Sequence, residues 1–155
     1  MRRKKKVQRD SVPDVKYGNA ILGKFINYVM KDGKKSTARR VVYDSFAFIE
    51  EKAKQDPLVV FDLAIKNLSP LVEIKSKRIG GATYQVPHEV RGERKLALAM
   101  RWLLTVSRAK TGAPMSKRLG EELILASKNE GSAMKKKMDT HRMAEANKAF
   151  AHFAR

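Results

Sequence analysis

The chain of 155 residues contains no cysteine, which excludes disulfides, thiol catalysis and cysteine-bearing zinc sites. This absence is consistent with a reducing compartment. No apolar run approaches the length of about 18 residues that suggests a membrane-spanning helix. The N-terminal sequence MRRKKKVQRD has no apolar stretch after its positive charges, so we expect that it is not a secretory signal.

Acidic residues are scarce. Asp and Glu total 16 against 34 Lys and Arg, which gives a formal net charge of +18. Charges of one sign repel one another, so this excess implies a partner that neutralises it. Nucleic acid is the leading candidate because each neutralised phosphate also releases counterions. An anionic membrane surface is second, and the low overall hydrophobicity weighs against it.

Residue patterns typical of catalysis are also missing. The segment Asp32–Ser36 (DGKKS) resembles the end of a phosphate-binding loop, but Tyr28 stands where that motif requires glycine. His141 and Glu145 are four residues apart, and an intrahelical pair explains this spacing better than a metal site does. We therefore expect no enzyme activity, no metal and no cofactor.

Apolar periodicity predicts a mainly α fold, with about six helices in a single domain spanning residues 1–155. The six helices are expected at about 21–31, 36–49, 57–69, 93–110, 116–126 and 132–153. The apolar positions of the last helix do not keep one stripe, so we infer that its far end meets something other than the core. Asp56-Pro57 is a strong start signal, and Ser36 and Ser116 are the expected N-caps of the second and fifth helices.

The sequence of residues 72–87 predicts a protruding two-stranded antiparallel β-hairpin between the third and fourth helices. Val72 and Ile74 alternate with polar residues, and Gly80-Gly81 tolerates the positive φ of a tight turn. A two-stranded ribbon of this kind is only marginally stable on its own in water. A basic one suggests a means of reaching a polyanion.

Positive charge is concentrated in further segments. We interpret residues 1–19 as a basic arm that stays extended until a partner neutralises its charge. On the fourth helix Arg94, Arg101 and Arg108 form a stripe opposite the apolar side, and we favour phosphate contact over a merely solvated face. Lys34, Lys35 and Arg39 could hold a phosphate at the start of the second helix.

Several segments closely resemble the bacterial family of small-subunit ribosomal protein seven. They are the sequence DGKKS at 32–36, RIGGATYQVP at 78–87, LAMRWL at 98–103 and HRMAEANKAFAH at 141–152, with Pro13-Asp14 and Tyr17-Gly18 near the start. The resemblance covers essentially the whole chain. One departure is the end, Phe153-Ala154-Arg155, where many relatives have an aromatic-arginine-tryptophan group.

The resemblance implies a structural ribosomal protein that binds the 3′ major domain of small-subunit ribosomal RNA and nucleates assembly of the subunit head. It implies neighbours in the eleventh and ninth proteins of the subunit, a cytoplasmic or organellar ribosome, and no membrane. Some members repress their own operon's message. The ribbon tip is expected near exit-site transfer RNA through Arg78, Ile79, Gly80, Gly81, Ala82, Thr83 and Tyr84.

The residues expected to contact ribosomal RNA are the Lys and Arg residues of these basic segments, together with one methionine in the loop before the fifth helix. They are Arg2, Arg3, Lys4, Lys5, Lys6, Arg9, Lys34, Lys35, Arg39, Lys75, Lys77, Arg78, Arg94, Lys95, Arg101, Arg108, Met115, Lys135, Lys136, Lys137 and Arg142.

The main alternative is an architectural DNA-binding protein, since it would explain the same charge and the same basic arm. Such proteins usually insert an apolar wedge into the minor groove. Here the predicted tip offers Gly80-Gly81, with only Ile79 as a small wedge.

Overall fold

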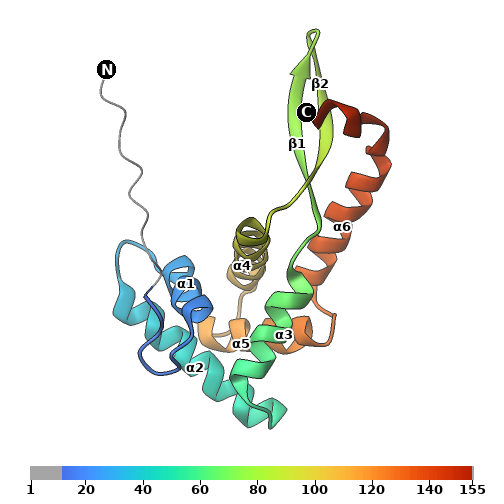
Figure 1. Cartoon of the computed structure of the whole chain (residues 1–155). Coiled ribbons are helices and arrows are strands. Elements are labelled where there is room, and N and C mark those ends of the chain that lie inside the picture. The colour runs from blue at the N-terminus through green and yellow to red at the C-terminus, as the bar shows by residue number, and fades with distance from the viewer. Residues whose placement is uncertain (1–11, 155) are drawn as a thin grey trace, which may run out of the picture.

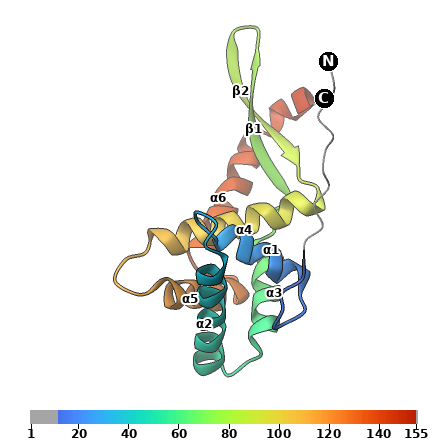
Figure 2. The same cartoon turned by 90° about the vertical axis from the view of Figure 1, so that its left-hand side faces the viewer.

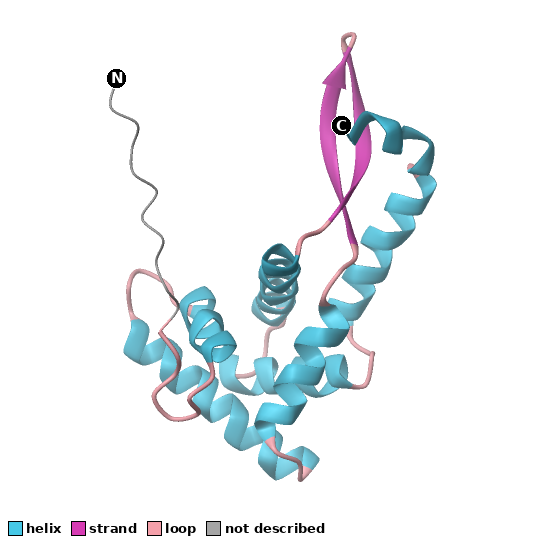
Figure 3. Cartoon of the chain, viewed as in Figure 1, coloured by secondary structure: helices cyan, strands magenta, loops and turns pink. Residues whose placement is uncertain are grey.

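The computed structural model describes residues 12–154, and this part of the chain is mainly helical with one two-stranded sheet (Figure 3). The elements are α1 (Ala20–Val29), α2 (Lys35–Ala53), α3 (Pro57–Leu68), β1 (Val72–Ile79), β2 (Ala82–Glu89), α4 (Gly92–Ala109), α5 (Met115–Ser127), α6 (Ser132–Ala146) and a 3-10 helix, η1 (Lys148–Ala154). This confirms the predicted fold class, with the hairpin between the third and fourth helices. None of the described helices is long and apolar enough to cross a membrane.

Side-chain caps are present at the start of two of the described α-helices, α1 and α3. At α3 the Asp56 carboxylate accepts the Leu58 N–H at 2.9 Å and Pro57 takes the first helical position, as predicted. The predicted caps Ser36 and Ser116 are wrong, because α2 and α5 begin one residue earlier, after Lys34 and Pro114, without a side-chain cap.

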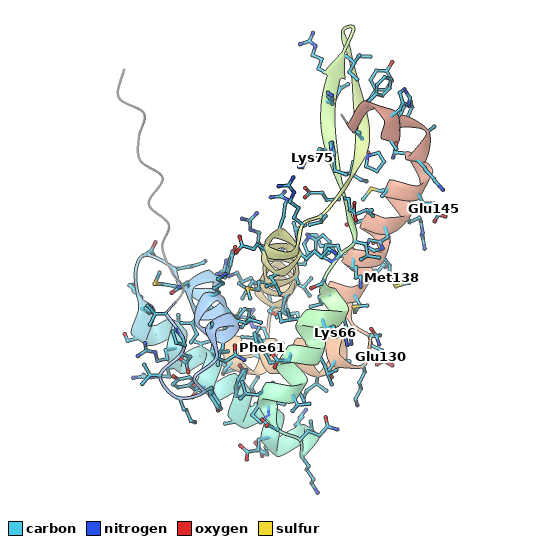
Figure 4. The ribbon with its side chains drawn as sticks, in the orientation of Figure 1. Phe61, Lys66, Lys75, Glu130, Met138 and Glu145 are labelled. Carbon is cyan, nitrogen blue, oxygen red and sulfur yellow. The ribbon has the colours of Figure 1, made fainter. Side chains whose placement is uncertain are left out.

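Three phenylalanines from three helices form the centre of the core. Phe61 of α3 lies 5.3 Å from Phe25 of α1 and 5.9 Å from Phe46 of α2, measured between ring centroids. All three are fully buried, together with Leu103 of α4 and Leu119 of α5. Figure 4 shows Phe61 pointing from α3 into this helical body. Burying aromatic side chains supplies much of the free energy that holds such a body together.

A buried carboxylate joins α4, α5 and α6. Glu122 is fully buried; its Oε1 accepts the Ala133 N–H at 2.8 Å, and its Oε2 lies 2.6 Å from Lys110 Nζ. The second contact is an ion pair between the Lys110 ammonium group and the carboxylate. Gly131 precedes α6 with φ +93°, and a Cβ there would lie 2.9 Å from Glu122 Oε1. The site therefore requires glycine on two grounds.

The hairpin rises from this body as a projecting ribbon, with α6 and η1 beside it (Figure 1). Its antiparallel register runs from Val72 opposite Glu89 to Ile79 opposite Ala82, so it extends two residues beyond the predicted end at 87. Gly80 and Gly81 have φ of 55° and 90°, which is the two-residue turn that the sequence predicts.

The final helix is not continuous, contrary to the prediction for 132–153. α6 ends at Ala146, and η1 turns back onto β2, where Tyr84 lies 5.2 Å from Phe150 and 5.6 Å from Phe153 between ring centroids. Lys77 Nζ also donates to the Phe153 carbonyl at 2.8 Å. The break lets these aromatic side chains reach the ribbon, and Figure 1 shows the segment against it.

Residues 12–19 do not form an extended arm, contrary to the prediction for 1–19. Asp14 is 5% exposed and accepts the backbone N–H groups of Lys16 and Tyr17 at 3.1 and 3.2 Å. Its carboxylate also accepts the Tyr43 hydroxyl of α2 at 2.9 Å. A buried carboxylate with several donors fixes this segment on the helical body. The rest of the predicted arm, residues 1–11, lies outside the described residues.

Candidate nucleic-acid interface

The clearest candidate site is a hollow of about 400 Å³ where α1 ends, α2 begins, α4 ends and α5 begins. We call it the basic hollow. Four of its residues are cations and, within the described part of the chain, no acidic residue lines it. Its residues are Val29, Lys31, Lys34, Thr37, Ala38, Val41, Arg108, Met115 and Arg118. Cations around an apolar floor suit a phosphate next to an unstacked base.

The lysines of the basic hollow are placed by the tight turn between α1 and α2. Asp32 and Gly33 have φ of 51° and 73°, and the Lys34 N–H donates to the Lys31 carbonyl at 3.0 Å. This turn brings both lysines to the N-terminal end of α2, where free N–H groups favour anions. The DGKKS segment therefore places two lysines at the start of a helix without being a phosphate-binding loop.

The two arginines of the basic hollow are held by backbone carbonyls. Arg108 Nη2 donates to the Val29 carbonyl at 3.2 Å, and Arg118 Nη1 donates to the Lys110 carbonyl. Arg118 Nε is buried and has no hydrogen-bond partner within the described residues. A buried donor without a hydrogen-bond partner is costly to the folded state.

The basic hollow joins three of the predicted contacts, Lys34, Arg108 and Met115. Sequence reasoning missed Lys31 and Arg118. The available signal for Arg118 was its position three residues after Met115 on one helix, which places the two side chains on the same side. Lys35 is exposed beside the hollow, whereas Arg39 is half-buried with an unpartnered buried Nε.

The arginine stripe of α4 is exposed as predicted, but each member has a partner within the protein. Arg94 holds Glu73 of β1 by a bidentate contact, with Nε 2.7 Å from Oε1 and Nη2 2.7 Å from Oε2. Arg101 lies over the Tyr28 ring, with its Cζ 5.9 Å from the centroid. Lys95, also predicted as a contact, is half-buried on the same helix. The arginines of the stripe therefore make contacts within the protein and also supply positive charge at its surface.

Glu73 anchors the base of the ribbon. It is 6% exposed, with Lys75 Nζ 3.1 Å from its Oε1 in addition to Arg94. Burial alone would raise its pKa, but the hydrogen bonds and charges of Arg94 and Lys75 outweigh burial and lower the pKa below the usual value. Figure 4 shows Lys75 pointing from the ribbon toward α4. The ribbon is therefore fixed to α4 by ionised groups.

The remaining predicted contacts are spread along the ribbon and the last helix. Arg78 is exposed near the ribbon tip, and Lys135, Lys136 and Arg142 are exposed on α6. Lys137 differs, because it is half-buried and donates to the Asn67 carbonyl; burial lowers its pKa. The predicted contacts Arg2, Arg3, Lys4, Lys5, Lys6 and Arg9 lie outside the described residues.

His141 does not make the predicted pair with Glu145. Its Nε2 accepts the Leu71 N–H at 3.2 Å, and burial lowers its pKa, with the charge of Lys137 adding to the effect. Among residues 12–154, no cluster of three or more His, Cys, Asp or Glu side chains could hold a metal ion.

A basic helical body with a projecting ribbon and a hollow lined by four cations is typical of a nucleic-acid-binding protein. Residues 1–148 match the model of the family described as ribosomal protein S7p/S5e, and the chain belongs to this family. Its members are RNA-binding parts of the small ribosomal subunit and act in translation as structural proteins, not as enzymes.

Similar proteins support the assignment along almost the full length. The chain is 57% identical over 152 residues to the small ribosomal subunit protein uS7 of Teredinibacter turnerae, covering 98% of this chain and 97% of that protein. It is 52% identical over 153 residues to the protein of the same name from Thermotoga petrophila, covering 99% of both chains. The predicted resemblance is thereby confirmed.

Proposed function

We propose that this protein binds the 3′ major domain of small-subunit ribosomal RNA and nucleates assembly of the subunit head. The observation that carries the proposal is the basic hollow, where four cations surround an apolar floor. The oxygens of a phosphate can accept charge-assisted hydrogen bonds from such cations.

Binding would depend on shape and phosphates more than on a linear sequence. The major groove of A-form RNA is too deep and narrow for side chains to read, so proteins contact phosphates, 2′-hydroxyls and unstacked bases. The basic hollow, the ribbon and the exposed cations of α6 lie on different elements of one body. Such an arrangement suits a folded junction of several RNA helices, and the cytoplasmic ribosome is the expected location.

The ribbon tip is the part we assign to exit-site transfer RNA. Arg78, Gly80, Gly81, Ala82 and Thr83 are exposed there, and the tip is narrow because two glycines form the turn. Its base is fixed to α4 through Glu73, and its middle is braced by η1. A braced ribbon positions its tip with less loss of conformational freedom on binding than a loose one.

In the subunit, the protein would contact two neighbouring proteins, the eleventh and the ninth. It would also repress its own message through the same RNA-binding surface. A message that folds into a similar junction would compete for the basic hollow. Competition between the two RNAs for one protein therefore tests this assignment.

Filter binding to a transcript of the 3′ major domain tests the role of the basic hollow. The variant Lys31→Gln/Lys34→Gln removes two cations, so the slope of log affinity against log salt should become shallower by about 1.4–1.8. The matched control is Lys52→Gln/Lys128→Gln, which removes two cations from the cavity between α2, α3 and α5. Equal slopes for the two variants would contradict the proposal.

A further inference from the structure

A second hollow lies between α1 and α4 and contains none of the residues of the basic hollow. Figure 2 shows these two helices side by side, and they are in contact. The hollow measures about 490 Å³, within the range of about 300–1,000 Å³ typical of small-ligand sites. We call it the α1–α4 groove. Its floor is formed by Leu96, Ala97 and Met100 of α4.

The α1 side of the groove carries an aromatic ring and an amide. Tyr28 is half-buried, and Arg101 over its ring restrains it. Asn27 is exposed, and its side-chain amide has no partner among residues 12–154. An amide offers both a donor and an acceptor, which is the combination that reads the edge of a base.

Two cations, Lys24 and Arg94, and the carboxylate of Glu93 complete the lining. Arg94 is fixed by Glu73 through Nε and Nη2, which leaves Nη1 outside that contact. Lys24 lies 4.0 Å from Glu93, whose side chain is 95% exposed. An ion pair this long and this exposed is weak, so a phosphate can replace Glu93 as the partner of Lys24.

These features together match what proteins use to hold a single base outside a helical stack. Aromatic and apolar side chains take its face, polar groups take its edge and cations take its phosphate. We propose that the α1–α4 groove holds one unstacked RNA nucleotide, with Asn27 bonded to the base edge and its phosphate between Lys24 and Arg94. This inference rests on the proposed function, and it adds base discrimination to a surface otherwise built for phosphates.

Two variants separate this site from general RNA binding. Asn27→Ala removes the amide without changing the charge, so affinity for the 3′ major domain transcript should fall about fivefold or more while the salt slope stays constant. Ala97→Met fills the floor and should weaken binding in the same way. Gln55→Ala, which removes an exposed amide from the loop between α2 and α3, is the matched control and should bind as the wild type does.

Interference mapping with a pool of transcripts, each lacking one base, identifies the nucleotide. The wild type should show a position where loss of the base weakens binding, and Asn27→Ala should make that position insensitive. If the wild type does not bind the transcript, the proposed function itself fails. If it binds and both groove variants bind equally well, the groove inference alone is overturned. Unchanged RNA binding with lost capture of a neighbouring subunit protein would also overturn it, because the groove would then hold protein.

Discussion

The buried Glu122 gives the sharpest test of how the body that carries the interface is held together. Glu122→Ala removes the acceptor of the buried Ala133 N–H and the partner of Lys110. An unpaired buried donor costs about 1–3 kcal/mol, and breaking a buried ion pair costs about 3–5 kcal/mol. The Lys110 side chain is 31% exposed and can reach water, so we expect the low end of both ranges, about 4 kcal/mol in total.

Glu122→Gln refines the test because it keeps an oxygen acceptor and nearly the same shape. It should cost about 1–2 kcal/mol, the part due to the charge beside Lys110. Glu130→Ala is the control, since Glu130 is exposed on the loop before α6, as Figure 4 shows, and should change stability by less than about 0.5 kcal/mol. The free energy of unfolding comes from urea titration followed by far-ultraviolet circular dichroism. Equal losses for Glu122→Ala and Glu130→Ala would refute the reasoning.

Three further predictions concern the ribbon and α6. The pKa of Glu73 is lowered in the folded state, so its contribution to stability is present above the usual value near 4.5 and is lost as pH falls through the lowered value. Urea titrations from pH 7 to 3 should therefore show a steeper loss of unfolding free energy for the wild type than for Glu73→Gln. Parallel curves for the two proteins would contradict this. Tyr84→Ala removes both aromatic contacts to η1, so amide exchange in β1 and β2 should accelerate at least tenfold, and unchanged exchange would show that η1 is no brace. Gly131→Ala combines positive φ with the close approach to Glu122, so it should lower stability by about 1–3 kcal/mol in the urea assay; a neutral result would count against the tight junction at α6.

Features fixed by local chemistry were predictable from the sequence. The hairpin follows from Gly80-Gly81, and the start of α3 follows from Asp56-Pro57. The second helix, expected at about 36–49 from apolar periodicity, is also present, and its Phe46 and Ile49 are fully buried. Each of these depends on neighbours within one or two turns, where propensity and periodicity act directly.

Features set by distant contacts were not predictable. The break after Ala146 depends on aromatic contacts with Tyr84, and no local pattern reveals a partner so far away in the sequence. Glu73 likewise gives Arg94 a partner that the helix periodicity of α4 cannot show. The basic hollow needs four helix ends to meet, so the sequence indicated Lys34 and Arg108 as separate contacts and missed Arg118.

Footprinting on full-length small-subunit ribosomal RNA tests the central claim most directly. The wild-type protein should protect nucleotides within the 3′ major domain. The Lys31→Gln/Lys34→Gln variant, at a concentration that keeps the RNA saturated, should lose one cluster of those protections and keep the others. Protection outside that domain, or a variant pattern identical to that of the wild type, would contradict the assignment of the basic hollow as an RNA-binding site.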